Sequence, residues 1–155
     1  MARYQTTLSI PVPIDAAFAY VSDFRHATWD PAVKSATRTD GNGPLGVGST
    51  FVLVSPLPIG SIHFHYRIEV YDPPNHVRLS GKTWFARYTD DLTLTSAGPG
   101  GGSATSLTYN ARFSLRGPLV LGEPIMQLIF NRVGAAATRG IPAAVEKAQP
   151  TRASQ

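Results

Sequence analysis

The sequence contains no cysteine and few charged residues, and both scarcities narrow the possible classes of protein. The absence of cysteine from all 155 residues excludes disulfides, thiolate metal sites and cysteine nucleophiles. Charged residues make up only 15% of the chain, whereas hydrophobic residues make up 43%. A chain that is disordered throughout has the opposite balance, so we expect a folded protein. Its length suits one domain rather than two.

The sequence also lacks long apolar runs and clusters of basic residues. No apolar run approaches the roughly 18 residues of a membrane span, and the first residues lack the apolar core of a signal peptide. We therefore expect a cytoplasmic protein without stable membrane insertion. The 14 Lys and Arg residues and 10 Asp and Glu residues give a net charge of +4. The basic residues are scattered, whereas nucleic-acid binders carry a clustered basic stripe, so we expect no nucleic-acid partner.

Alternation of apolar and polar residues, which is typical of strands, runs through most of the chain. It predicts strands over residues 3–11, 33–39, 49–54, 62–71, 76–80, 83–95 and 104–115. In the clearest strand, one face is predicted to carry Ile62, Phe64, Tyr66, Ile68 and Val70.

Helical patterns occur near both ends of the chain. Asp15 is predicted to cap a short helix that ends by Asp23, and a second short helix or turn follows over residues 24–31. Glu123-Pro124 begins an amphipathic helix of about 25 residues. Its apolar arc is predicted to include Ile125, Met126, Ile129 and Phe130, and its polar side Gln127 and Thr138.

This order of elements predicts an α+β fold with a curved antiparallel sheet of about seven strands around a long C-terminal helix. Consecutive strands joined by tight turns form an antiparallel meander. One helix, about 10–12 Å across, covers such a sheet only if the sheet curls around it. The curl leaves an apolar cavity between helix and sheet. We expect a single domain over residues 1–148 and a flexible tail over 149–155.

Several segments carry a family resemblance. They are IPVPIDAAFAYVSDF at residues 10–24 with Trp29-Asp30-Pro31, Gly48-Ser49-Thr50-Phe51, YRIEV at 66–70 with Asp72-Pro73-Pro74, Asp90-Asp91-Leu92-Thr93-Leu94, and Gly117-Pro118-Leu119. In this order the segments resemble the START-like, or SRPBCC, superfamily and its polyketide cyclase/dehydrase branch. The resemblance covers nearly the whole chain. It implies the helix-grip fold, with two short helices after the first strand, and a hydrophobic cavity for lipids, polyketides or similar molecules.

Asp90 is the candidate catalytic residue. Alternation places it on the inward face with Leu92 and Leu94, where burial would raise its pKa and suit it to move a proton. The alternative is a carboxylate that is solvated near the strand end or bonded to a loop. The predicted ligand-binding residues share an inward position or a place at the cavity end: Trp29, Phe51, Phe64, Tyr66, Tyr88, Asp90, Tyr109, Phe113, Met126 and Phe130.

The sequence shows no complete set of metal ligands and no cofactor-binding motif. His63 and His65 share a face of one strand, but it is the outward face with Arg67 and Glu69, and zinc needs a third ligand. We therefore predict no metal site and no cofactor. The Gly- and Pro-rich loops 40–47 and 55–61 are predicted to gate the cavity.

Three functions remain open at this stage. The first is a carrier or sensor that binds a hydrophobic small molecule. The second is a polyketide cyclase, aromatase or dehydratase that uses the same cavity, with Asp90 and a tyrosine as the proton shuttle. The third is a protein-interaction module, and a homodimer is also possible.

Overall fold

The computed structural model describes residues 1–98 and 102–149. Most of the predicted tail, residues 150–155, therefore lies outside the described residues. Seven strands form one antiparallel sheet in the order β1-β7-β6-β5-β4-β3-β2. The strands are β1 (Ala2–Ile10), β2 (Ser35–Arg38), β3 (Thr50–Pro56), β4 (Ser61–Asp72), β5 (His76–Lys82), β6 (Ala86–Ala97) and β7 (Ala104–Leu115). The sheet is thus the predicted meander, with β1 added beside the last strand.

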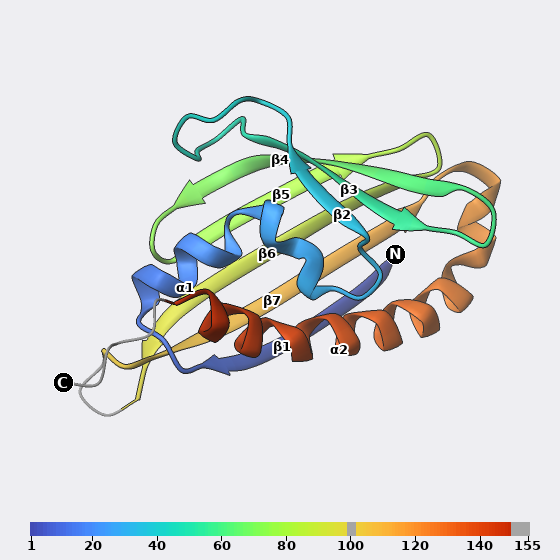
Figure 1. Ribbon diagram of the computed structural model, residues 1–155. Coiled ribbons are helices and arrows are strands. Elements are labelled where there is room, and N and C mark those ends of the chain that lie inside the picture. The colour runs from blue at the N-terminus through green and yellow to red at the C-terminus, as the bar shows by residue number, and fades with distance from the viewer. Residues whose placement is uncertain (99–101, 150–155) are drawn as a thin grey trace.

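The helices among the described residues lie on one face or at one end of the curved sheet (Figure 1). They are α1 (Ile14–Val21), the 3₁₀ helices η1 (Phe24–Trp29) and η3 (Gly117–Gly122), and α2 (Glu123–Ala148). The long helix α2 runs across this face beside β1, while α1 and η1 cover its other part (Figure 1). The predicted α+β architecture, with a long final helix and two short helices after the first strand, is confirmed. No helix among the described residues is both long enough and apolar enough to cross a bilayer.

The start of α1 differs from the prediction. The capping residue is Pro13, whose carbonyl accepts a hydrogen bond from Ala17 N at 3.0 Å, and Asp15 lies inside the first turn. Proline suits the start of a helix because its φ is already restricted. A carboxylate in the first turn favours the helix through its dipole rather than as a cap.

A bulge in β4 changes which side chains of that strand face inward. Ile68 pairs with Leu79, but Val70 pairs with Arg78 and Tyr71 with Val77, so the register shifts between Ile68 and Val70. An extra residue in a strand reverses the alternation beyond it. Val70 therefore lies on the outer face, contrary to the prediction. Tyr71 takes the inward position, with its ring 5.4 Å from that of Phe18.

The inward face of α2 is also rotated from the predicted one. Thr138, predicted to be outward, is buried and lies 3.1 Å from the Tyr4 hydroxyl of β1. Gln127, also predicted to be outward, bonds to both the backbone N–H and the carbonyl of Arg3. Ile125 and Ile129 are correspondingly exposed. The hydrophobic pattern missed this because α2 packs along β1 partly through polar groups.

Candidate functional site

A cavity of about 310 Å³ lies between the concave face of the sheet and the first half of α2. Its walls come from β3, β4, β6, β7, α2 and η1 with the segment after it. The side chains that line it are mostly aromatic or aliphatic: Phe24, Ala27, Trp29, Asp30, Ala32, Val33, Leu53, Ser55, Ile62, Phe64, Tyr66, Phe85, Tyr88, Asp90, Tyr109, Ala111, Phe113, Met126, Ile129, Phe130 and Val133.

Every predicted ligand-binding residue except Phe51 lines this cavity. Phe51 is completely buried in the core, and its ring lies 6.1 Å from that of Phe24. Phe24 from η1 lies over it and lines the cavity in its place. The prediction placed Phe51 on the correct face of the sheet, but strand alternation gives no information about what covers each position along the strand.

Asp90 is a buried carboxyl on the apolar wall of the cavity. Its neighbours two residues along β6, Tyr88 and Leu92, are buried, and Asp90 itself is only 7% exposed. Burial raises the pKa of Asp90 to about 7, because a carboxylate loses its hydration there. Near neutral pH the side chain is therefore divided between its neutral and ionised forms. This is the property that a residue needs in order to give or take a proton.

The hydroxyls of Tyr66 and Tyr109 stand beside Asp90 and oppose this rise by favouring its ionised form. Burial raises the pKa of both phenols well above the ordinary value, and the Asp90 charge raises it further. Both tyrosines therefore keep their protons at physiological pH. Together the three side chains form a polar spot of one acid and two donors on an apolar wall.

Tyr88 is engaged differently, although it also lines the cavity. Its hydroxyl donates to the carbonyl of His65 at 3.0 Å and accepts from the backbone N–H of His65 at 2.9 Å. Gly81 makes this possible, since a Cβ at residue 81 would lie 1.9 Å from the His65 oxygen. The phenol of Tyr88 thus replaces ladder hydrogen bonds where β5 leaves β4. Its ring is available to a ligand, but its hydroxyl is already bonded.

Asp30 is a second carboxyl on the cavity wall. The sequence analysis named it only within the Trp29-Asp30-Pro31 segment and did not predict it as a site residue. It accepts a hydrogen bond from Ala32 N at 2.8 Å. Burial raises the pKa of Asp30 in spite of this bond. Its negative charge also contributes to the raised pKa of Asp90. The sequence did offer a way to find Asp30. Trp29 was predicted to line the cavity, and Asp30 is its neighbour in the chain, so Asp30 could also have been expected near the cavity.

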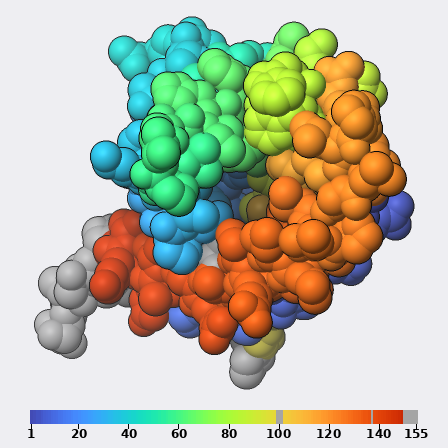
Figure 2. All heavy atoms as spheres, turned by 90° about the vertical axis from the view of Figure 1, so that its right-hand side faces the viewer, coloured from blue at the N-terminus to red at the C-terminus, as the bar shows by residue number. Residues whose placement is uncertain are grey.

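One end of the molecule opens onto the cavity. Figure 2 looks at this end and shows a hollow between the β3–β4 hairpin, the β5–β6 turn and the start of α2. Ser55 and Ile62 flank the β3–β4 turn, and both line the cavity. The predicted gate at residues 55–61 therefore lies at this mouth, although its movement stays a prediction.

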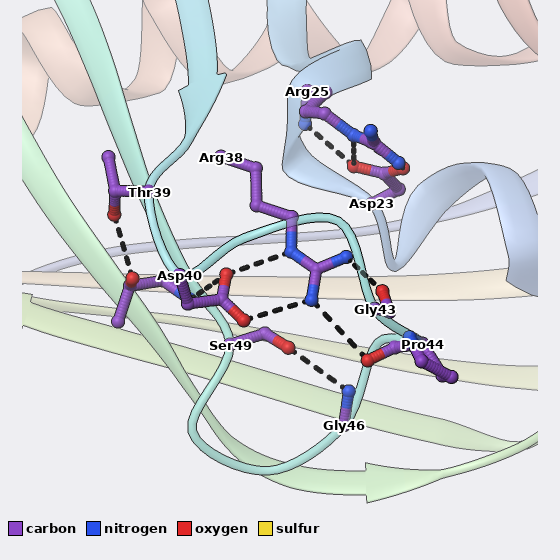
Figure 3. Close-up of polar contacts among 10 residues, drawn as sticks. Asp23, Arg25, Arg38, Thr39, Asp40, Gly43, Pro44, Gly46 and Ser49 are labelled. Atoms are coloured by element: carbon purple, nitrogen blue, oxygen red, sulfur yellow. Dashed lines mark hydrogen bonds and ion pairs between the residues drawn. The ribbon is translucent and has the colours of Figure 1, made fainter.

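The other predicted gate, residues 40–47, precedes β3 and lies at the opposite end of that strand. None of its residues lines the cavity. Arg38 fastens this loop through Asp40 Oδ1 at 2.8 Å and through the carbonyls of Gly43 and Pro44, and Gly46 N donates to Ser49 Oγ (Figure 3). This loop therefore does not lie at the mouth described above, and its role as a gate stays a prediction.

His63 and His65 lie on the outer face of β4, as the alternation indicates. Among the described residues, no three side chains of the metal-binding types gather as a metal ion would require. The outer face does carry one ionic cluster, in which Asp91 binds His76 at 2.6 Å and Arg78 at 2.6 Å. This cluster braces β5 against β6 on the side of the sheet away from the cavity.

A protein-family model described as "Polyketide cyclase / dehydrase and lipid transport" matches residues 1–146. The chain belongs to this family. The START-like (SRPBCC) resemblance of the sequence is thereby confirmed. Proteins of this family bind hydrophobic ligands or act as cyclases. No curated protein matches the chain.

Solved structures show the same fold at low sequence identity. The Zhui aromatase/cyclase from Streptomyces sp. R1128 has a TM-score of 0.76 and 11% identity, over 99% of this chain and 98% of that chain. TTHA0849 from Thermus thermophilus has a TM-score of 0.75 and 16% identity, over 96% and 99% of the two chains. A START superfamily protein from Mycobacterium smegmatis has a TM-score of 0.73 and 14% identity, over 96% and 100%. The likeness therefore extends over whole chains.

Proposed function

We propose that the chain binds one small hydrophobic molecule in its cavity and acts as a carrier or sensor of it. The observation that carries the proposal is the apolar cavity with a polar spot at Asp90, Tyr66 and Tyr109. A volume of about 310 Å³ falls at the lower end of the range typical of ligand pockets. It suits a compact polycyclic or short-chain molecule with one polar group.

The polar spot sets the orientation of this ligand. The apolar body lies against Phe64, Phe113 and Phe130, where burial of its surface supplies most of the binding free energy. A hydroxyl or carbonyl of the ligand lies next to Asp90, where it can form hydrogen bonds. Elsewhere on this wall a polar atom would lose its hydrogen bonds to water without replacing them. Lipid-like and polyketide-like molecules both combine these features.

A second candidate function is a cyclase or dehydratase of the same cavity. The specific observation in its favour is the pKa of about 7 at Asp90, beside two protonated phenols and near Asp30. In this function Asp90 takes a proton from the bound chain, and Tyr66 or Tyr109 donates a hydrogen bond to the oxygen that gains charge. The cavity walls fold the flexible chain so that its reacting atoms meet.

Ligand binding can be tested by filling the cavity. Ala111 lies on the cavity wall at the centre of β7, so Ala111→Phe should place a ring in the space that a ligand needs. We expect native mass spectrometry to detect a co-purifying small molecule on the unaltered protein and at least ten-fold less on this variant. Titration with 1-naphthol, a neutral aromatic alcohol, should show the same loss of affinity.

Asn110→Phe is the matched control, because the neighbouring residue of β7 faces the other side of the sheet. It should leave both measurements unchanged. Equal retention and equal naphthol affinity in Ala111→Phe and the unaltered protein would contradict the proposal. If a ligand is recovered, Asp90→Asn separates the two functions: a carrier keeps binding with no chemistry to lose, whereas an enzyme keeps binding and stops converting the ligand.

A further inference from the structure

Large apolar side chains are exposed around the mouth of the cavity on separate elements. Ile59 in the β3–β4 turn is 92% exposed, Trp84 in the β5–β6 turn 83%, and Leu121 at the end of η3 89%. Leu57 in the β3–β4 turn, Leu119 and Val120 in η3, and Ile125 and Leu128 in the first turns of α2 are also exposed. We call the residues in these two lists the apolar rim. Exposed apolar side chains that gather around one opening of a protein indicate an interaction site.

The rim is continuous with the cavity wall. Trp84 is followed by Phe85, which lines the cavity, and their rings lie 5.3 Å apart. Leu128 of α2 is followed by Ile129, which is half exposed and also lines the cavity. In Figure 2 the β3–β4 turn, the β5–β6 turn and the start of α2 stand as separate projections around the hollow rather than as one flat patch. A surface that accepts this rim must therefore accept several apolar projections at once and lie over the opening between them.

Basic side chains accompany the rim. Lys82 and Arg87 flank the Trp84 turn, Arg116 precedes η3, and Arg132 follows Leu128 by one helical turn; all four are exposed. Glu123, the acidic residue at the start of α2, is occupied with the backbone N–H of Leu115. Apolar residues at projecting tips with cations beside them fit the interface of a bilayer, where acyl chains lie beneath anionic head groups.

We propose that the apolar rim docks on the surface of an anionic lipid bilayer, so that the cavity mouth faces the lipid. A second copy of the chain fits less well, because a symmetric contact would bring the same cations together. Docking of this kind inserts only the turn tips and the first turns of α2, so it needs no membrane-spanning segment. It explains why the mouth, and not the fastened opposite end, carries the exposed tryptophan.

The proposal does not require a particular cavity ligand, and it is tested with vesicles as the only probe. We expect the protein to float with vesicles of equal parts phosphatidylcholine and phosphatidylglycerol, and to do so less with phosphatidylcholine alone or in high salt. The triple variant Ile59→Ser, Trp84→Ser, Leu121→Ser should lose at least roughly ten-fold in vesicle partitioning. All three side chains are on the surface, so its melting temperature should be little changed.

Val47→Ser is the matched control, because Val47 is an exposed apolar residue of the loop at the opposite end of the molecule. It should bind vesicles as the unaltered protein does. Absence of the unaltered protein from the floated vesicles, or equal flotation of the triple variant, would overturn the proposal. So would a dimer in sedimentation that the triple variant abolishes, since the rim would then be covered by a second copy. Ligand retention in vesicle-free buffer is a separate measurement and tests only the proposed function.

Discussion

At the scale of single residues, burial of Asp90 lowers the free energy of unfolding at neutral pH relative to acidic pH. The folded state keeps the Asp90 proton up to a pH of about 7, whereas the unfolded chain releases it near the ordinary value of 3.8. The free energy of unfolding therefore falls as pH rises between these two values and levels off above the higher one. The difference corresponds to roughly 4 kcal/mol at most.

We therefore expect Asp90→Asn to stabilise the protein in a pH-dependent manner. At pH 8 the variant should be more stable than the unaltered protein by about 1–4 kcal/mol, and near pH 4 the two should be similar. Urea denaturation at both pH values measures this. Asp72→Asn, at an exposed position of β4, is the control and should show no comparable difference between the two pH values. A variant that is less stable than the unaltered protein at pH 8 would show that ionised Asp90 contributes favourable bonds to the fold.

The residue types of the site could be predicted from the sequence, but their roles in the cavity could not. Alternation in β6 and β7 correctly placed Asp90 and Tyr109 on the inward face, because antiparallel strands with one buried face have a strict period of two. It could not distinguish Tyr109, whose hydroxyl meets Asp90, from Tyr88, whose hydroxyl is bonded to His65. That difference depends on where β5 separates from β4, which is a property of two neighbouring strands.

At the scale of elements, the crossing of α2 over β1 depends on close contact between a glycine and an aromatic ring. A Cβ at Gly134 would lie 2.6 Å from the Tyr4 ring, closer than side-chain carbons approach. The hydroxyl of the same ring reaches Thr138 one turn along α2. Alanine is better than glycine in a helix by about 1 kcal/mol, but here the added methyl group must displace the ring.

We expect Gly134→Ala to destabilise the protein by about 1–3 kcal/mol, because overpacking outweighs the gain in helix propensity. In a Tyr4→Leu background, which removes the ring, the same substitution should be neutral or stabilising. A double-mutant cycle from chemical denaturation gives the coupling between the two sites. Additive effects of the two substitutions would show that α2 does not approach β1 through this contact.

Elements whose packing follows a simple period could be predicted, whereas irregular ones could not. The seven strands and the long helix are regular, and their order determined the antiparallel sheet. The bulge after Ile68 leaves no trace in the alternation until the partner strand is known. The orientation of α2 depends on Gln127 and Thr138, polar residues that a hydrophobic pattern assigns to solvent but that here bond to β1.

At the scale of the whole molecule, the two ends of the sheet have different properties. The end with residues 40–47 is held by the Arg38 network, and the end with the β3–β4 turn opens onto the cavity. We expect a cavity ligand such as 1-naphthol to slow amide hydrogen exchange in residues 57–60 and in the first turns of α2. Residues 40–47 should exchange at the same rate with and without it. Protection confined to residues 40–47 would place ligand entry at the other end.

The strand order has a consequence for how the chain reaches its native state. Among the seven described strands, β1 comes first in the sequence and its ladder partner β7 comes last, and Ala2 lies opposite Phe113. Contacts between positions so distant in sequence are slow to form, since a long loop must close first. While the ribosome is still translating the hairpins in between, β1 has no neighbour to pair with. The sheet therefore reaches its full width only after β7 has emerged, and any truncation that removes β7 leaves the first strand without a place in the fold.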